Sequence, residues 1–239
     1  MTVPTPRLPR LLIAAECFSD AQSAFRLVRP LQELFSAQLS GLLSSHEFAE
    51  YAVTAGQQIV SATGSFVDIP SPRHAHGIAA GEARAFRRAL AEVADKDTRD
   101  WTFRSLSGEL ISEVCGLAAP EDVVLLGRRP ICRSEGRVLL IGSDTSRRQS
   151  ARALAERMAL ALMTAVREIE VRRGGNDVLR TVDRSHAALV VADFREGPLK
   201  KESELRALFE AARCPVVILG ASEIRSSNDP GAAAEQGKE

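Results

Sequence analysis

Short apolar runs alternate with stretches of helical periodicity along most of this 239-residue chain. A continuous apolar run of four to eight residues is typical of a strand buried on both faces, and a 3.6-residue period is typical of an amphipathic helix. The expected strands span residues 10–16, 38–44, 101–106, 123–127, 138–142, 166–171, 187–192 and 215–219. The expected helices span residues 19–35, 82–95, 110–118, 146–163, 178–182 and 205–212. This alternation predicts an α/β fold with mainly parallel sheets flanked by helices, of the Rossmann-like kind.

The chain carries a diverged copy of its own beginning. Arg10 and the strand after it align without a gap on Arg137 and its own strand, at an offset of 127 that holds for more than twenty residues. Along this register Gln22-Ser23-Ala24 falls on Gln149-Ser150-Ala151. A strand and helix that occur twice predict two related α/β units, which we place at residues 1–134 and 135–221.

The two units differ in what they lack. The first contains an irregular flap at residues 46–80 and has no room for a last helix and strand before the second unit begins. The second has that helix and strand but is shorter. We therefore expect the two units to pack against each other within one chain. Residues 222–239 are small and polar and predict a disordered tail.

Two details of the first helix can be predicted from single residues. Ser19 is suited to cap its amino terminus, because a serine hydroxyl can accept from the free backbone N–H groups there. Pro30 is expected to kink or break the helix, because proline lacks the N–H that an inner turn needs.

Composition excludes several classes of function. Lys+Arg and Asp+Glu both number 31, so no net charge attracts the chain to nucleic acid or to a membrane surface. Its longest apolar run near the start is far too short to span a bilayer or to form a signal peptide, so we expect a cytoplasmic protein. The four cysteines are scattered without a CxxC pair, which favours buried, reduced thiols.

With the strands in place, the pattern resembles the universal stress protein family, present twice. Three sets of segments carry this resemblance: the strand–helix openings (11–37 and 138–163), the short helix followed by an apolar strand (108–127 and 175–193), and the closing run 214–219. The resemblance implies a small α/β protein that dimerises, or whose two halves pair in a tandem chain. It also implies a regulatory or protective role rather than catalysis. Some members of the family bind ATP.

The glycine-rich phosphate loop of the ATP-binding members is incomplete in both units. After the fourth strand the first unit offers Gly127 and Arg128, but Pro130 then supplies no N–H and the next strand follows at once. The second unit offers a single glycine in 193–198, beside two carboxylates that repel a triphosphate. We therefore expect no cofactor, with ATP as an alternative that the sequence leaves open.

The candidate ligand residues form a weak set. Asp144 loosely matches the acidic residue that follows the first strand in universal stress proteins, so its role is implied by the resemblance. Ser146 and Arg147 lie at the start of the second unit's helix, where free N–H groups favour an anion. Gly127 and Arg128 end a strand at the edge where α/β sheets bind ligands. We take these five as candidates for an anion or nucleotide site. The pair His74 and His76 has no third ligand nearby and sits in what reads as a solvated loop, so no metal site is expected.

No nucleophile elbow or base cluster points to catalysis, so we expect no enzyme. The leading hypothesis is a non-catalytic, stress-related or regulatory module that acts through protein contacts or by sensing a small ligand. Three alternatives stay open. They are a nucleotide-binding stress protein, a receiver-like signalling unit at 137–220 with Asp193 as phosphoacceptor, and, ranked last, a nucleotide hydrolase.

Overall fold

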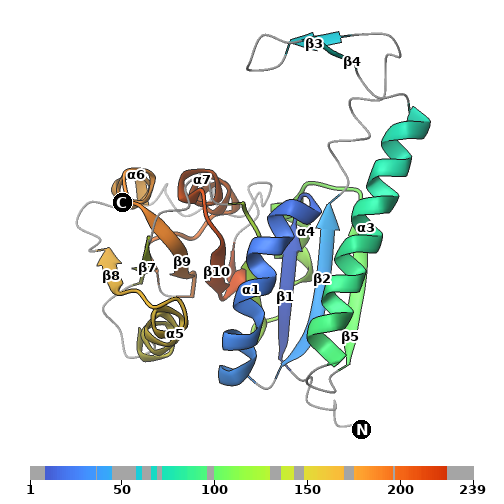
Figure 1. Cartoon of the computed structure of the whole chain (residues 1–239). Coiled ribbons are helices and arrows are strands. Elements are labelled where there is room, and N and C mark those ends of the chain that lie inside the picture. The colour runs from blue at the N-terminus through green and yellow to red at the C-terminus, as the bar shows by residue number, and fades with distance from the viewer. Residues whose placement is uncertain are drawn as a thin grey trace, which may run out of the picture.

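One eight-stranded sheet, in the order β5-β2-β1-β6-β10-β9-β7-β8, organises the molecule (Figure 1). The computed structural model describes residues 9–35, 37–44, 58–60, 66–68, 72–95, 100–129, 136–142, 148–169, 175–195 and 197–224. The strands of this sheet are β1 (Arg10–Ala15), β2 (Gln38–Ser44), β5 (Trp101–Leu106), β6 (Val123–Leu126), β7 (Arg137–Ile141), β8 (Val166–Ile169), β9 (Ala187–Asp193) and β10 (Val216–Leu219). The helices are α1 (Phe18–Leu34), α3 (Pro72–Asp95), α4 (Leu110–Leu117), α5 (Arg148–Ala161), α6 (Gly175–Asp183), α7 (Glu202–Ala212) and the 3-10 turn η2 (Ala221–Glu223). The predicted α/β class with a mostly parallel sheet is confirmed.

The same local topology occurs twice in this sheet. In the first half β1 lies between β2 and β6, and in the second β7 lies between β8 and β9, with all of these neighbours parallel. The registers also correspond, because Leu11 pairs with Val123 and its counterpart Val138 pairs with Leu189. It follows that the residue after β6, Gly127, occupies the position that Asp193 holds in the second half.

Strand β10 joins the two halves. It runs parallel to β9 on one side and antiparallel to β6 on the other, with Val217 opposite Leu125. Both residues are completely buried. The edge that the first half leaves open is therefore covered by the last strand of the second half, and the sheet is continuous across the chain.

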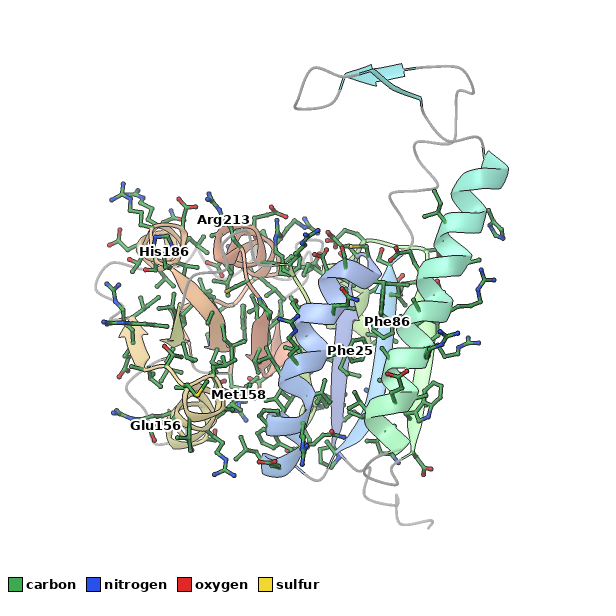
Figure 2. The ribbon with its side chains drawn as sticks, in the orientation of Figure 1. Phe25, Phe86, Glu156, Met158, His186 and Arg213 are labelled. Atoms are coloured by element: carbon green, nitrogen blue, oxygen red, sulfur yellow. The ribbon has the colours of Figure 1, made fainter. Side chains whose placement is uncertain are left out.

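Helices cover both faces of the sheet, and alternate strand residues serve the two cores. Leu11 and Ile13 point into a cluster with α1, α3 and α5, whereas Leu12 and Ala14 point into a cluster with α4, α6 and α7. On the first face the ring of Phe25 (α1) meets that of Phe86 (α3) edge to face, with centroids 5.1 Å apart (Figure 2). Strands buried on both sides explain why the sequence showed continuous apolar runs rather than alternation.

The predicted irregular flap is wrong over part of its length. A two-stranded antiparallel pair, β3 (Gln58–Val60) with β4 (Phe66–Asp68), lies inside it, and α3 begins at Pro72 rather than at residue 82. Proline is well tolerated in the first turn of a helix, because the N–H that it lacks has no partner there. The early turns of α3 and the β3–β4 pair project beyond the sheet (Figure 1).

Three smaller expectations are also corrected. Cys17 rather than Ser19 is the N-cap residue of α1, and α1 continues through Pro30 to Leu34. Because the fixed φ of proline is helical, Pro30 removes one hydrogen bond while Leu27, Val28 and Leu31 keep their burial. The predicted tail begins too early, since η2 is ordered and Ile224 is 8% exposed. Residues 225–239 lie outside the described residues.

Candidate functional site

The carboxyl ends of β1 and β6 meet the amino terminus of α1, and this is where a ligand of an open α/β sheet binds. Here the chain itself fills that place. The N–H of Gly127 donates to the carbonyl oxygen of Ala14 (2.7 Å). A β-carbon at Gly127 would lie 2.8 Å from the carbonyl oxygen of Asp20 and 3.1 Å from the Cα of Ala21. Backbone therefore packs on backbone at Gly127.

The backbone donors around this edge are occupied by the chain's own carboxylates. The N–H of Arg129 donates to Oδ1 of Asp20 (2.7 Å). The N–H of Phe18, at the start of α1, donates to Oε2 of Glu82, which reaches across from α3. Free N–H groups at a helix start are the groups that bind phosphate oxygens elsewhere. In the first half, carboxylate oxygens stand where phosphate oxygens would bind.

The second half repeats this arrangement at the equivalent position. The N–H of Arg195, which corresponds to Arg129, donates to Oδ1 of Asp193 (3.0 Å). The Arg195 guanidinium also binds both carboxylate oxygens, from Nε to Oδ1 (3.0 Å) and from the terminal nitrogen to Oδ2 (2.9 Å). These hydrogen bonds, which Arg195 donates to Asp193, are the main cause of a raised pKa of Arg195. The Asp193 side chain is 7% exposed, so this pair is largely shielded from water.

Arg195 covers the end of the sheet in the second half. Its stem packs on Gly220, where a β-carbon would lie 2.3 Å from the Cγ of Arg195. Gly220 has φ +72°, a conformation that favours glycine. The terminal nitrogen of Arg195 also lies 3.4 Å from the hydroxyl of Ser150 on α5. In the first half the equivalent hydroxyl, that of Ser23, donates to the carbonyl oxygen of Arg128 (2.8 Å).

The turn from β9 into α7 is closed in the same manner. The Lys200 ammonium donates to the carbonyl oxygen of Arg195 (2.7 Å), and the N–H groups of Lys200 and Lys201 donate to Oε2 of Glu204 (2.7 and 2.9 Å). Glu204 therefore caps the amino terminus of α7. Neither of these two N–H groups is left free for an anion.

The five predicted site residues are not brought together by the described structure. Asp144, Ser146 and Arg147 lie outside the described residues, so their role stays a prediction. Gly127 is buried against α1. Arg128 stacks over the ring of Phe209 in α7 (4.8 Å to the centroid) and its terminal nitrogen donates to the carboxylate of Glu210 (3.0 Å). Its charge is therefore already paired, in a contact between the two halves.

The carboxylates that define these edges escaped the sequence analysis. Asp20 was recognisable only as an acid in the first turn of a helix, and Glu82 as a charged position on another helix. Their convergence on Arg129 and Phe18 depends on tertiary packing. Asp193 was identified, but as a repulsive charge rather than as the partner of Arg195.

The histidine pair is placed differently from the prediction. His74 and His76 belong to α3, not to a loop. Among the described residues no group of three His, Cys, Asp or Glu could hold a metal ion. In that same part of the chain no helix has the length and apolar character needed to cross a membrane.

The thiols are held in their protonated form. Burial raises the pKa of Cys214 to about 12, and burial together with the charges of Glu202 and Glu109 raises that of Cys115 to about 12. Burial also raises the pKa of Cys17. A thiolate is the reactive form, so none of these three is poised as a nucleophile. Cys132 lies outside the described residues.

Comparisons with known proteins give distant structural matches. No protein-family profile matches the chain, and no curated protein matches it. A universal stress protein from Archaeoglobus fulgidus DSM 4304 is 10% identical, with 92% of this chain and 97% of that chain covered and a TM-score of 0.45. The cytoplasmic domain of a prokaryotic cation chloride cotransporter is 10% identical, with 91% and 97% covered and a TM-score of 0.40. The Archaeoglobus fulgidus universal stress protein in complex with dAMP is 8% identical, with 88% and 96% covered and a TM-score of 0.22. These values assign the chain to no family.

Proposed function

We propose that this chain is a non-catalytic, regulatory or stress-related module of the universal-stress-protein kind. Its two related halves are paired within one chain, and it acts in the cytoplasm through protein contacts or small-ligand sensing. In this proposal the module functions without the glycine-rich phosphate loop of the ATP-binding universal stress proteins. A nucleotide-binding stress protein is the main alternative.

One observation supports this proposal above the others. In both halves a carboxylate binds the backbone N–H two residues after the equivalent positions Gly127 and Asp193. Asp20 accepts from the N–H of Arg129, and Asp193 accepts from the N–H of Arg195. A triphosphate would have to displace these carboxylates and would meet their negative charge. The polar groups at both strand ends serve the fold, and a function in protein contact leaves them undisturbed.

The receiver-like alternative is disfavoured by the surroundings of Asp193. A phosphoacceptor needs a carboxylate oxygen that is free to attack a phosphoryl donor, and both oxygens of Asp193 bind the Arg195 guanidinium. Incubation with acetyl phosphate followed by intact-mass measurement tests this point. A stable increase of one phosphoryl group, lost in Asp193→Asn, would favour the receiver.

Binding of nucleotide to the purified chain tests the main proposal. Equilibrium dialysis with radiolabelled ATP or AMP, each with Mg²⁺, is expected to show no saturable binding up to millimolar concentration. An ATP-binding universal stress protein serves as the positive control. Native mass spectrometry of protein isolated from its host is expected to give the mass of the bare chain. A co-purifying nucleotide, or saturable binding in the dialysis, would favour the nucleotide-binding alternative instead.

A further inference from the structure

The outer edge of β5 is unpaired among the described strands. β5 pairs with β2 on one side, in parallel register from Leu39 opposite Trp101 onward. The N–H of Leu39 donates to the carbonyl oxygen of Asp100 (3.4 Å). Because backbone groups alternate in direction along a strand, residues 101, 103 and 105 turn their N–H and C=O groups to the outer edge. An open strand edge of this kind can bind another extended chain.

Arginines lie on both sides of this edge. Arg84, Arg87 and Arg88 are exposed on α3, which packs beside β5 (Figure 1), and Arg87 lies over the ring of Phe103 in β5 (5.1 Å to the centroid). Arg104 is exposed on β5 itself. Phe103 packs into the core beneath α3, so the neighbouring Arg104 projects from the opposite face of the sheet.

None of these four arginines forms an ion pair with a described carboxylate, and two acids nearby do not offset them. Exposed Glu92 and Asp100 lie towards the amino end of β5, at the carboxyl end of α3 and just before β5. A third acid, Glu113, lies beyond the other end of β5, where a β-carbon at Gly108 would be 2.5 Å from its carboxylate. The four arginines thus lie along the strand between acids at its two ends.

The opposite edge of the sheet is different. β8 has four residues, against six in β5. Glu168 of β8 is paired with Arg152 at 3.8 Å. β8 also carries one exposed arginine, Arg167, for which no described ion pair exists. β5 therefore has the longer described strand and the larger group of arginines without a described acidic partner.

We propose that the outer edge of β5 binds an acidic, extended segment of a partner protein, which adds to the sheet as a further strand. The backbone of residues 101, 103 and 105 would pair with the incoming strand. Acidic side chains on its two faces would meet Arg84 and Arg87 on one side and Arg104 on the other. This inference rests on the proposed function, in that both place the activity of the chain in protein contacts.

Charge and geometry favour this occupant over two others. A second copy paired edge to edge would bring Arg104 close to its own counterpart, and like charges across strands are destabilising. A nucleic acid would be attracted by the arginines, but it has no backbone N–H and C=O groups to pair with the strand edge. A binding experiment distinguishes all three occupants.

The binding probe is a fluorescein-labelled peptide of sequence Thr-Glu-Glu-Val-Glu-Glu-Val-Glu-Thr, measured by fluorescence polarisation on the full chain. The first control peptide replaces both valines with proline, which keeps the charge but prevents strand pairing. The second control replaces every glutamate with lysine. The acidic peptide is expected to bind saturably and more weakly as salt rises, and neither control is expected to bind.

Two protein variants separate charge from strand addition. Ser105→Pro removes an outward N–H that β2 does not use, so it is expected to abolish binding while the melting temperature stays near that of the wild type. Ser105→Ala keeps the N–H and is expected to bind normally. The double variant Arg84→Glu/Arg104→Glu is expected to weaken binding about tenfold or more, because two attractive contacts become repulsive. It keeps the test decisive even if Ser105→Pro is unstable.

Any one of the following four results would overturn the inference. Equal binding of the proline-containing peptide would show attraction to negative charge without strand addition. Equal binding of single-stranded DNA would favour a nucleic acid, and a concentration-dependent dimer blocked by Ser105→Pro would favour self-pairing. Absence of acidic-peptide binding would remove the proposed site. None of these results involves nucleotide, so the dialysis experiment continues to test the proposed function independently.

Discussion

Replacing Gly127 with alanine measures how tightly the end of β6 is closed against α1. The added methyl carbon would lie 2.8 Å from the carbonyl oxygen of Asp20 and 3.1 Å from the Cα of Ala21. Both neighbours are helix backbone, which cannot rotate aside as a flexible side chain does. Overpacking of this kind costs about 1–3 kcal/mol, so we expect the free energy of unfolding to fall by about that amount in Gly127→Ala.

Gly142 provides the matched control, because it follows β7 as Gly127 follows β6. Among the described residues, no atom lies within 4 Å of a β-carbon at Gly142. Alanine there reduces the freedom of the unfolded chain, and a gain of about 0.4–1 kcal/mol is expected. Urea unfolding followed by circular dichroism gives both values. If Gly127→Ala proved as stable as Gly142→Ala, the edge would have space for a ligand and our reasoning about its closure would be refuted.

Three further predictions concern stability. Asp122→Ala should lower the free energy of unfolding by about 3–5 kcal/mol, measured by urea unfolding. The substitution removes a carboxylate that is 1% exposed and leaves the Arg10 guanidinium, which is 17% exposed, without its partner. A loss of about 1 kcal/mol or less would contradict this. Gln32→Leu should raise the melting temperature, with a gain of about 1 kcal/mol in the free energy of unfolding. The buried side-chain amide of Gln32 has no described hydrogen-bond partner on its nitrogen or its oxygen. A lower melting temperature would contradict this prediction. Burial raises the pKa of Glu109, but hydrogen bonds from Arg206 and the N–H of Ser112 outweigh it and lower the pKa from its ordinary 4.5. A carboxyl group whose pKa is lowered in the folded state adds stability above its unfolded pKa and loses it as pH falls through the folded pKa. Acid unfolding below about pH 4.5 should therefore become less steep in Arg206→Ala, and an unchanged profile would contradict the assignment.

The positions of the strands could be predicted because the strands are buried on both faces. The predicted strands at 101–106 and 38–44 match β5 and β2 in full, and the other strands of the sheet differ from prediction by one or two residues at their ends. β5 is the exception in its burial, since Thr102, Arg104 and Ser105 are exposed and its sequence alternates between apolar and polar residues. Continuous burial leaves a continuous apolar run in the sequence, so these elements are visible locally. The pairing of β10 with β6 is not visible in this way, because it joins segments about ninety residues apart and depends on how the two halves meet.

Helix ends were harder to predict than strands. Gly77 was taken as a break in structure, yet Gly77 and Gly81 both lie inside α3, and no described atom lies within 4 Å of a β-carbon at either position. A solvated helix tolerates glycine at a cost of about 1 kcal/mol each, which the packing of Phe86 and Leu90 can outweigh. The predicted break at Pro30 is wrong for the same reason, since the buried face of α1 continues beyond it.

The incomplete phosphate loop is visible in the sequence, but the groups that replace it are not. Asp20, Glu82 and Asp193 are three of the 31 acidic residues. Asp193 was singled out from the sequence as a phosphoacceptor candidate, but no sequence pattern marks any of the three as the partner of these backbone N–H groups. Tertiary packing brings Asp20 and Glu82 to backbone donors that lie far from them along the chain, whereas Asp193 binds the N–H group of Arg195 two residues later. A site made by tertiary contacts between ordinary surface-type residues leaves no local motif.

The most direct test observes the three backbone N–H groups that these carboxylates bind. In two-dimensional NMR spectra of the ¹⁵N-labelled chain, ATP with Mg²⁺ is added to millimolar concentration while the amide signals of Phe18, Arg129 and Arg195 are followed. We predict that these three signals stay in place, because Glu82, Asp20 and Asp193 already bind the amides. Saturable shifts of the Arg129 and Arg195 signals would contradict this and would show that a nucleotide can displace the carboxylates.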